Sequence, residues 1–157
     1  MADDMTNCFE SQKDDTFSLM AAANRQVNGY ISDCLNRAGA GNLAPSHGDI
    51  FNLLFSEGDV RMGEIAEKIE RDPSTVTVLV NKLKRLGYVD VYRDEFDRRV
   101  TKVRLTKKGE GFKSIFQGVT NDLAHIQERV FSEQERKTLK EMLEKMRDAY
   151  SEERNRV

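Results

Sequence analysis

The sequence is poor in the residues that build disulfide frameworks, metal sites and membrane spans. Its 157 residues include two cysteines, two histidines and no tryptophan. Cys8 and Cys34 form no CxxC pair and no cluster with the histidines, which argues against a disulfide framework or a zinc site and fits a reducing compartment. No apolar run approaches the ~18 residues that a membrane span needs. We therefore expect a cytoplasmic protein without a metal or another cofactor.

Patterns that carry catalysis are missing as well. The chain has no glycine-rich phosphate loop, no HExxH pattern and no recognisable Ser/His/Asp arrangement, so we do not expect an enzyme. Residues 1–15 are acidic and polar without periodicity; they do not resemble a secretory signal and predict a disordered acidic tail. The rest of the chain, with many charged residues and moderate hydrophobicity, is expected to be soluble and globular.

Charge is distributed unevenly along the chain. Residues 1–60 carry three basic and nine acidic side chains, residues 61–108 carry 13 and eight, and residues 109–157 carry nine and ten. A basic middle between acidic or neutral flanks is typical of a protein in which one segment meets phosphate groups. A solvated charged face gives the same pattern, and charge alone does not decide between the two.

Helical periodicity dominates both ends of the chain. Region 16–42 is predicted to be one long helix, with apolar side chains three and four residues apart: Phe17, Met20, Val27, Ile31, Leu35 and Ala38. In region 109–157 the apolar stripe from Phe112 to Val130 predicts a second long helix, and Ser132 with Glu135 forms a capping box that opens a third. The stripe of that last helix consists of Leu139, Met142, Leu143, Met146 and Tyr150.

The middle region, 43–108, predicts a small mixed unit. A helix that begins near Pro45 is followed by a short strand at 60–62 and a compact helix at 63–70. Asp72 as N-cap and Pro73 open another helix, which runs to Leu86 and stops at Gly87. Two β-rich runs, 88–93 and 100–105, flank the polar loop 94–99 and predict a hairpin. The fold class is thus mainly α with a small β-wing: a winged helix-turn-helix flanked by long N- and C-terminal helices.

The helix from Pro73 to Leu86 has the composition of a DNA-reading helix. Its inner stripe is Val76, Leu79, Val80, Leu83 and Leu86. Its outer face carries small polar, apolar and basic side chains that can reach base edges or phosphates, namely Ser74, Thr75, Thr77, Val78, Asn81, Lys82 and Arg85. An ordinary amphipathic helix with a wet face would look similar, so the assignment depends on the hairpin that follows.

The hairpin carries arginines at and near its tip. Arg98 and Arg99 lie in the loop, Arg93 on the incoming strand, and Lys102 and Arg104 on the outgoing strand. Such a tip can enter the narrow minor groove, where the negative potential is deepest. Asp97 can hold an arginine side chain extended, which reduces the entropy lost on contact.

These segments resemble the MarR family of bacterial transcription regulators. The resemblance is strong from about residue 45 to 112 and is carried by GEIA at 63–66, STVTVLVNKL at 74–83, GYV at 87–89 and DRRVTKVRLTKKG at 97–109. It implies an obligate dimer with interleaved terminal helices, which reads a pseudo-palindromic operator in the bacterial cytoplasm as a repressor or activator. It also implies control by a small anionic or aromatic effector, or by cysteine oxidation.

The resemblance also assigns residue roles. Arg99 is expected in the minor groove with Asp97 as its partner, and residues 74, 75, 77, 78, 81 and 82 take the recognition-helix positions. Many relatives have arginine where this chain has Val78; valine cannot bond guanine but can contact a thymine methyl group, which favours A·T-rich sites read partly by shape. Cys8 matches the region where thiol-sensing relatives carry their cysteine, although an inert surface cysteine is the simpler interpretation.

Apolar stripes on the flanking helices predict a homodimer independently of the resemblance. A unit of some 60 residues cannot cover them, and large exposed apolar patches are rare on monomers. The residues expected at the interface are Phe17, Met20, Val27, Ile31, Phe116, Leu123, Leu139, Leu143, Met146 and Tyr150. A monomeric helical bundle packed on the winged unit is the alternative.

His47 is a candidate effector contact, because it stands at the start of the second helix, where a helix N-terminus attracts anions. A surface or hydrogen-bonded structural histidine is the competing interpretation. For the whole protein, the competing class is a winged-helix adaptor that binds other proteins without DNA, which the low isoelectric point of about 5.8 favours.

Overall fold

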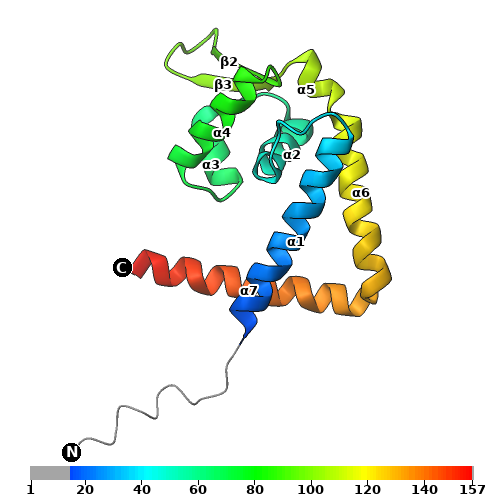
Figure 1. Cartoon of the computed structure of the whole chain (residues 1–157). Helices are drawn as coiled ribbons and strands as arrows, with labels where there is room; N and C mark the ends of the chain where they lie inside the picture. The colour runs from blue at the N-terminus through cyan, green and yellow to red at the C-terminus, as the bar shows by residue number, and fades with distance from the viewer. Residues whose placement is uncertain (1–14, 157) are drawn as a thin grey trace, which may run out of the picture. The chain divides into compact units, whose positions relative to one another are not determined.

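The computed structural model describes residues 15–156, so the expected acidic tail and Cys8 lie outside or at the edge of the described residues. The chain divides into two compact units, residues 1–110 and 111–157. Figure 1 labels most of the elements. The first unit holds α1 (Thr16–Arg37), η1 (Pro45–His47), α2 (Gly48–Glu57), β1 (Val60–Arg61), α3 (Met62–Lys68), α4 (Pro73–Arg85), β2 (Val89–Arg93), β3 (Thr101–Leu105) and most of α5 (Lys107–Gly111); the second holds α6 (Lys113–Val130) and α7 (Glu133–Arg156).

The mainly helical fold with a small β-wing is confirmed. Strands β2 and β3 form the predicted hairpin, with Val89 opposite Leu105 and Arg93 opposite Thr101. The short strand β1 pairs with β3 on its other side, which gives an antiparallel sheet in the order β1-β3-β2. In Figure 1 the hairpin projects from the first unit beside α3 and α4. This is the arrangement of a winged helix-turn-helix.

The core of the first unit lies among α2, α3, α4 and the sheet. Its largest fully buried side chains are Ile50, Phe51, Leu54, Ile65, Val76, Val80, Leu83, Val103 and His47. Phe51 packs edge-on against Tyr88 with ring centroids 5.7 Å apart, which ties α2 to the start of β2. Three members of the predicted inner stripe of α4 are buried, whereas Leu79 and Leu86 are half-buried. The outer face of α4 is thereby held away from the core.

Two glycines shape the passage from α4 through the wing into α5. Gly87 has φ +80°, a left-handed conformation that glycine adopts without the strain of a side chain, and it ends α4 as predicted. At Gly109 an added Cβ would lie 2.1 Å from the carbonyl oxygen of Tyr88. Thr106 closes the same junction, since its hydroxyl donates to the Gly87 carbonyl at 2.6 Å. The Leu-Thr-x-x-Gly segment at the end of the wing therefore allows close packing between α5 and the start of the wing.

Helix α1 is long and mostly exposed. Its only buried residues are Cys34 and Leu35, at the end that contacts η1. Cys34 belongs to the core, and its Sγ lies 3.2 Å from Nη2 of Arg37. The remaining length of α1 carries apolar side chains without a cover within its own unit.

The second unit consists of two helices that have no buried residue between them. Their junction confirms the capping box: Ser132 Oγ accepts from the Glu135 N–H at 3.3 Å, and the Glu135 carboxylate accepts from the Ser132 N–H at 2.8 Å. The helix predicted from Phe112 to Val130 is confirmed as α6, which begins at Lys113 after the short helix α5 ends at Gly111. Phe112 between them is buried.

Candidate nucleic-acid interface

The outer face of α4 is open to solvent as the sequence predicted. Ser74, Thr75, Thr77, Asn81 and Arg85 are exposed, and Lys82 is half-buried. Val78 is 67% exposed at the centre of this face, where its apolar side chain is open to contact with a ligand. Thr77 Oγ1 donates to the Pro73 carbonyl at 2.9 Å, which fixes the rotamer of its hydroxyl. Asp72 stands at the N-cap position but makes no side-chain capping hydrogen bond there.

The wing tip is an ordered turn built around Asp94, a residue that the sequence did not single out. One carboxylate oxygen accepts the backbone N–H groups of Phe96 and Asp97, at 2.9 and 3.1 Å, and the other pairs with Lys102 Nζ at 2.6 Å. The Lys102 ammonium, together with these N–H groups, lowers the pKa of Asp94 to about 2. The tip therefore keeps its shape over the whole physiological pH range.

The arginines of the tip are presented differently from one another. The Arg99 side chain is 96% exposed, and its Nε lies 3.9 Å from Asp97 Oδ1. Asp97 acts mainly on the backbone, because the same oxygen accepts the Arg99 N–H at 3.0 Å. Arg93 reaches back to the Arg99 carbonyl at 3.3 Å, and Arg98 is exposed. Asp97 and Arg93 thus both fix the main chain at Arg99 and leave its guanidinium extended.

The strand cations of the hairpin are engaged within the sheet. Lys102 is paired with Asp94, as described above. Arg104 pairs with Asp90 at 3.0 Å and lies 4.4 Å above the Tyr92 ring. These side chains stabilise the hairpin, which leaves the tip arginines as the cations that project from it.

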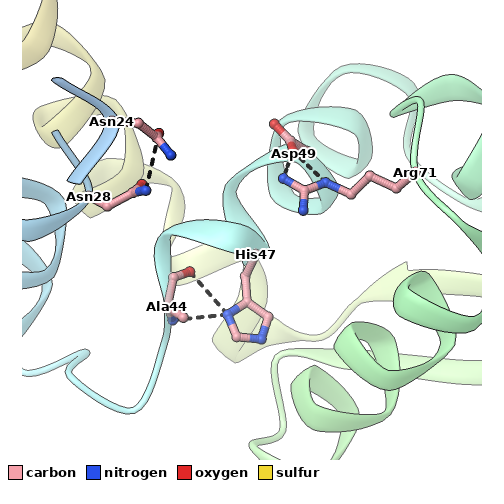
Figure 2. A network of polar contacts seen from close by, with 6 residues as sticks. All are labelled: Asn24, Asn28, Ala44, His47, Asp49 and Arg71. Atoms are coloured by element: carbon pink, nitrogen blue, oxygen red, sulfur yellow. Dashed lines mark hydrogen bonds and ion pairs between the residues drawn. The ribbon is translucent and has the colours of Figure 1, made fainter. Parts of the chain in front are cut away.

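His47 lies in the core rather than on the surface. It is 1% exposed; Nδ1 accepts from the Ala44 N–H at 2.9 Å, and Nε2 has no hydrogen-bond partner (Figure 2). Burial lowers the pKa of His47, and the nearby Lys82 charge lowers it further against the opposing effect of the Ala44 hydrogen bond. The ring is therefore neutral at physiological pH and occupies the junction of η1 and α4.

An open cleft lies beside His47 on the surface of the same unit. Its walls come from α1, from the η1–α2 segment and from Arg71 in the turn between α3 and α4, and His47 does not line it. Arg71 Nη2 and Asp49 Oδ2 form an ion pair 2.7 Å long at its edge, and Asn28 donates to Asn24 on the opposite wall (Figure 2). The cleft therefore offers amide and guanidinium groups to a small molecule.

The side chains expected at a dimer interface are exposed or half-exposed within their own units. On α1 these are Phe17, Met20, Val27 and Ile31; on α6 and α7 they are Phe116, Leu123, Leu139, Leu143, Met146 and Tyr150. A shallow groove along the inside of the α6–α7 turn is lined in part by Leu139 and Leu143. Each unit thus has an apolar face that the other residues of the same unit do not cover.

Two other kinds of site are absent from the described part of the chain. No group of three or more histidine, cysteine, aspartate or glutamate side chains is placed to hold a metal ion there. Among the helices of residues 15–156, none combines the length and the apolar character needed to cross a membrane.

Comparison with known proteins agrees with this geometry. Residues 43–101, which include α2, α3, α4 and most of the wing, match the model of the MarR family. By this match, residues 43–101 are a MarR-family segment. Over 133 residues it is 29% identical to the HTH-type transcriptional regulator MhqR of Bacillus subtilis, an alignment that covers 83% of this chain and 88% of MhqR.

Solved structures of MarR-type proteins share the fold. A MepR-like protein complexed with pseudoligands is 26% identical, with a TM-score of 0.68 and coverage of 87% of this chain and 94% of that one. A variant of MarR from E. coli complexed with operator DNA has a TM-score of 0.73 at 18% identity, and covers 87% of this chain and 99% of its own. Because the identity is 18%, the similarity to the MarR variant shows a shared fold only.

Proposed function

We propose that this chain is a MarR-family transcriptional regulator of the cytoplasm that binds double-stranded DNA sequence-specifically as a homodimer. The observation that carries the proposal is the joint exposure, on one compact unit, of the polar face of α4 and an ordered wing tip with an extended arginine. Operator DNA in the MarR complex and the regulatory role named for MhqR support the same function. An adaptor that binds only proteins has no need of either feature.

In this proposal α4 reads the major groove. Asn81 can pair with adenine, the hydroxyls of Ser74, Thr75 and Thr77 bond bases or phosphates, and Lys82 and Arg85 contact phosphate. Val78, exposed at the centre of the face, packs on the methyl group of a thymine. Replacing that thymine by uracil should weaken binding of the parent protein but not of Val78→Ala.

The wing supplies a second contact, in the minor groove. Arg99 enters the groove, where a guanidinium is attracted most strongly if the groove is narrow. Its backbone is already fixed by Asp97 and Arg93, so little conformational freedom is lost on binding. Arg98, exposed beside it, contacts the phosphate backbone.

Dimerisation accounts for the uncovered apolar faces of α1, α6 and α7. A second copy buries them, and a two-fold axis sets the two copies of α4 about 34 Å apart, which is one turn of DNA. The operator is then an inverted repeat.

The cleft between α1 and the η1–α2 segment is the proposed effector site. Arg71 can exchange its pairing with Asp49 for an anionic group of the effector, and the exchange would alter the turn that leads into α4. His47 does not line this cleft. It lies in the junction of η1 and α4, and we propose that a bound effector shifts this junction. Binding of such a molecule relieves or strengthens operator binding by shifting the orientation of α4.

The proposal is tested with a duplex selected from a random pool, titrated at several salt concentrations. Arg99→Ala should weaken binding to most sites. It should also lower the slope of log affinity against log salt by about 1, because the variant lacks one cation that interacts with the DNA. Asn81→Ala should instead relax the preference at one base pair, worth about 1–3 kcal/mol. Lys137→Ala, an exposed cation of α7, serves as the control and should leave affinity unchanged.

Two outcomes would overturn the proposal. A parent protein that fails to bind any duplex, even in dilute buffer, would favour the adaptor. A selected pool without an inverted repeat would contradict the dimeric reading of the operator.

A further inference from the structure

The wing tip ends in an exposed aromatic ring. Phe96 is 99% exposed, more than any other large hydrophobic side chain in the described part of the chain. Its neighbours in the loop are charged, and the ring contributes nothing to the core of its unit. A side chain of this size in water forgoes the stabilisation that burial would bring, so it is a candidate for burial against a partner.

The main chain beneath the ring is fixed. The N–H of Phe96 and that of Asp97 both donate to the carboxylate of Asp94, which Lys102 holds from the other side. The turn is closed by the Asp94 N–H donating to the Val100 carbonyl at 2.9 Å. A ring displayed on an ordered turn loses less conformational freedom on binding than one on a loose loop.

We propose that Phe96 packs against the deoxyribose wall of the minor groove beside Arg99, as a second, apolar contact of the wing. The inference rests on the proposed DNA binding. Arg99 is three residues further on in the same turn, and its side chain is 96% exposed. If the wing places Arg99 in the minor groove, it also places the Phe96 ring next to the groove wall. Apolar side chains, phenylalanine among them, are used in this way by minor-groove proteins.

The apolar character of the ring fits sugar rather than phosphate as its partner. Glu95 and Asp97 flank Phe96 in the chain, and both are exposed. Their carboxylates oppose the approach of DNA as a whole, whereas the faces of the deoxyribose rings carry no charge and can pack against an aromatic ring. In this arrangement the arginine is attracted by the negative potential of the groove, and the phenylalanine packs against the groove wall.

The test compares Phe96→Ala with the parent on the selected duplex across about 50 to 200 mM salt. We expect a roughly tenfold loss of affinity, as for an apolar ring that is partly buried on binding. The salt slope should stay unchanged because no cation is removed. Phe96→Leu should retain most of the affinity, and Glu95→Ala, the matched control on the same turn, should bind at least as well as the parent.

Hydroxyl-radical footprinting gives an independent readout at the sugars. Phe96→Ala should lose protection of the deoxyriboses in the minor groove under the wing and keep the protection of the backbone sugars that flank α4. If the parent binds and Phe96→Ala matches it in affinity and footprint, the inference is wrong while the proposed function stands. If Phe96→Ala instead changes the sedimentation of the DNA-free protein, the ring contacts a second protein molecule and the inference is also wrong. Failure of the parent to bind DNA at all is failure of the proposed function.

Discussion

The winged unit and the α6–α7 unit are built from the same kinds of residue but bury them to opposite extents. The first contains almost all of the described core, centred on Phe51, Ile65 and Leu83. The second is two long helices without one buried residue. Isolated helices gain most of their stability from packing of an apolar face, so α6 and α7 need a cover that their own unit lacks. Apart from α1, the winged unit covers most of its own apolar side chains, whereas the α6–α7 unit does not.

The largest effect is expected from breaking that interface. Leu143→Glu places a charge in the apolar stripe of α7, where burial of an unpaired carboxylate is costly, and should weaken self-association by roughly 100-fold or more. Sedimentation equilibrium measures it. Lys137→Glu on the polar face of the same helix is the control and should leave association nearly intact. Equal behaviour of the two variants would mean that the α7 stripe is not an interface.

The next effect is expected within the winged unit. Gly109→Ala would place a Cβ 2.1 Å from the Tyr88 carbonyl oxygen and 3.0 Å from Leu105 Cδ2, so the wing must shift. Thermal or urea unfolding should show a loss of about 3 kcal/mol. Gly111→Ala, whose Cβ meets nothing within 4 Å, is the matched control and should be neutral or gain up to about 1 kcal/mol of helix stability. A tolerated Gly109→Ala would refute the close packing.

A smaller effect concerns His47 and pH. Because burial lowers the pKa of His47 below its ordinary value of 6.5, the unfolded chain binds the proton more readily than the folded one. The free energy of unfolding should therefore fall as pH drops below about 6.5 and level off once pH passes the folded-state pKa. Urea midpoints between pH 7.5 and 5 measure the trend. His47→Gln should flatten the curve in that window, and an unaltered curve would show that His47 does not titrate as the structure requires.

Local signals in the sequence account for most of the fold. Gly87 as a helix stop and the Ser132–Glu135 box each depend on neighbours a few residues away, and the structure confirms both. The outward face of α4 follows from helical periodicity, because the core needs only one side of the helix.

Features that depend on residues far apart in the chain could not be predicted from the sequence. Asp94 organises the wing tip only because hairpin pairing brings Lys102 to it across the turn. The sequence leaves His47 open between an effector contact and a hydrogen-bonded structural histidine. Packing of η1 against α4, far along the chain, buries it and supports the second interpretation.

The most direct test of the account is the mass of the protein, free and bound to the selected duplex, by sedimentation equilibrium. The account predicts a free particle of twice the chain mass of 18.0 kDa and a complex of two chains on one duplex. A free particle of one chain mass that binds the duplex singly would contradict it, because dimerisation through the apolar faces of α1, α6 and α7 would then not occur.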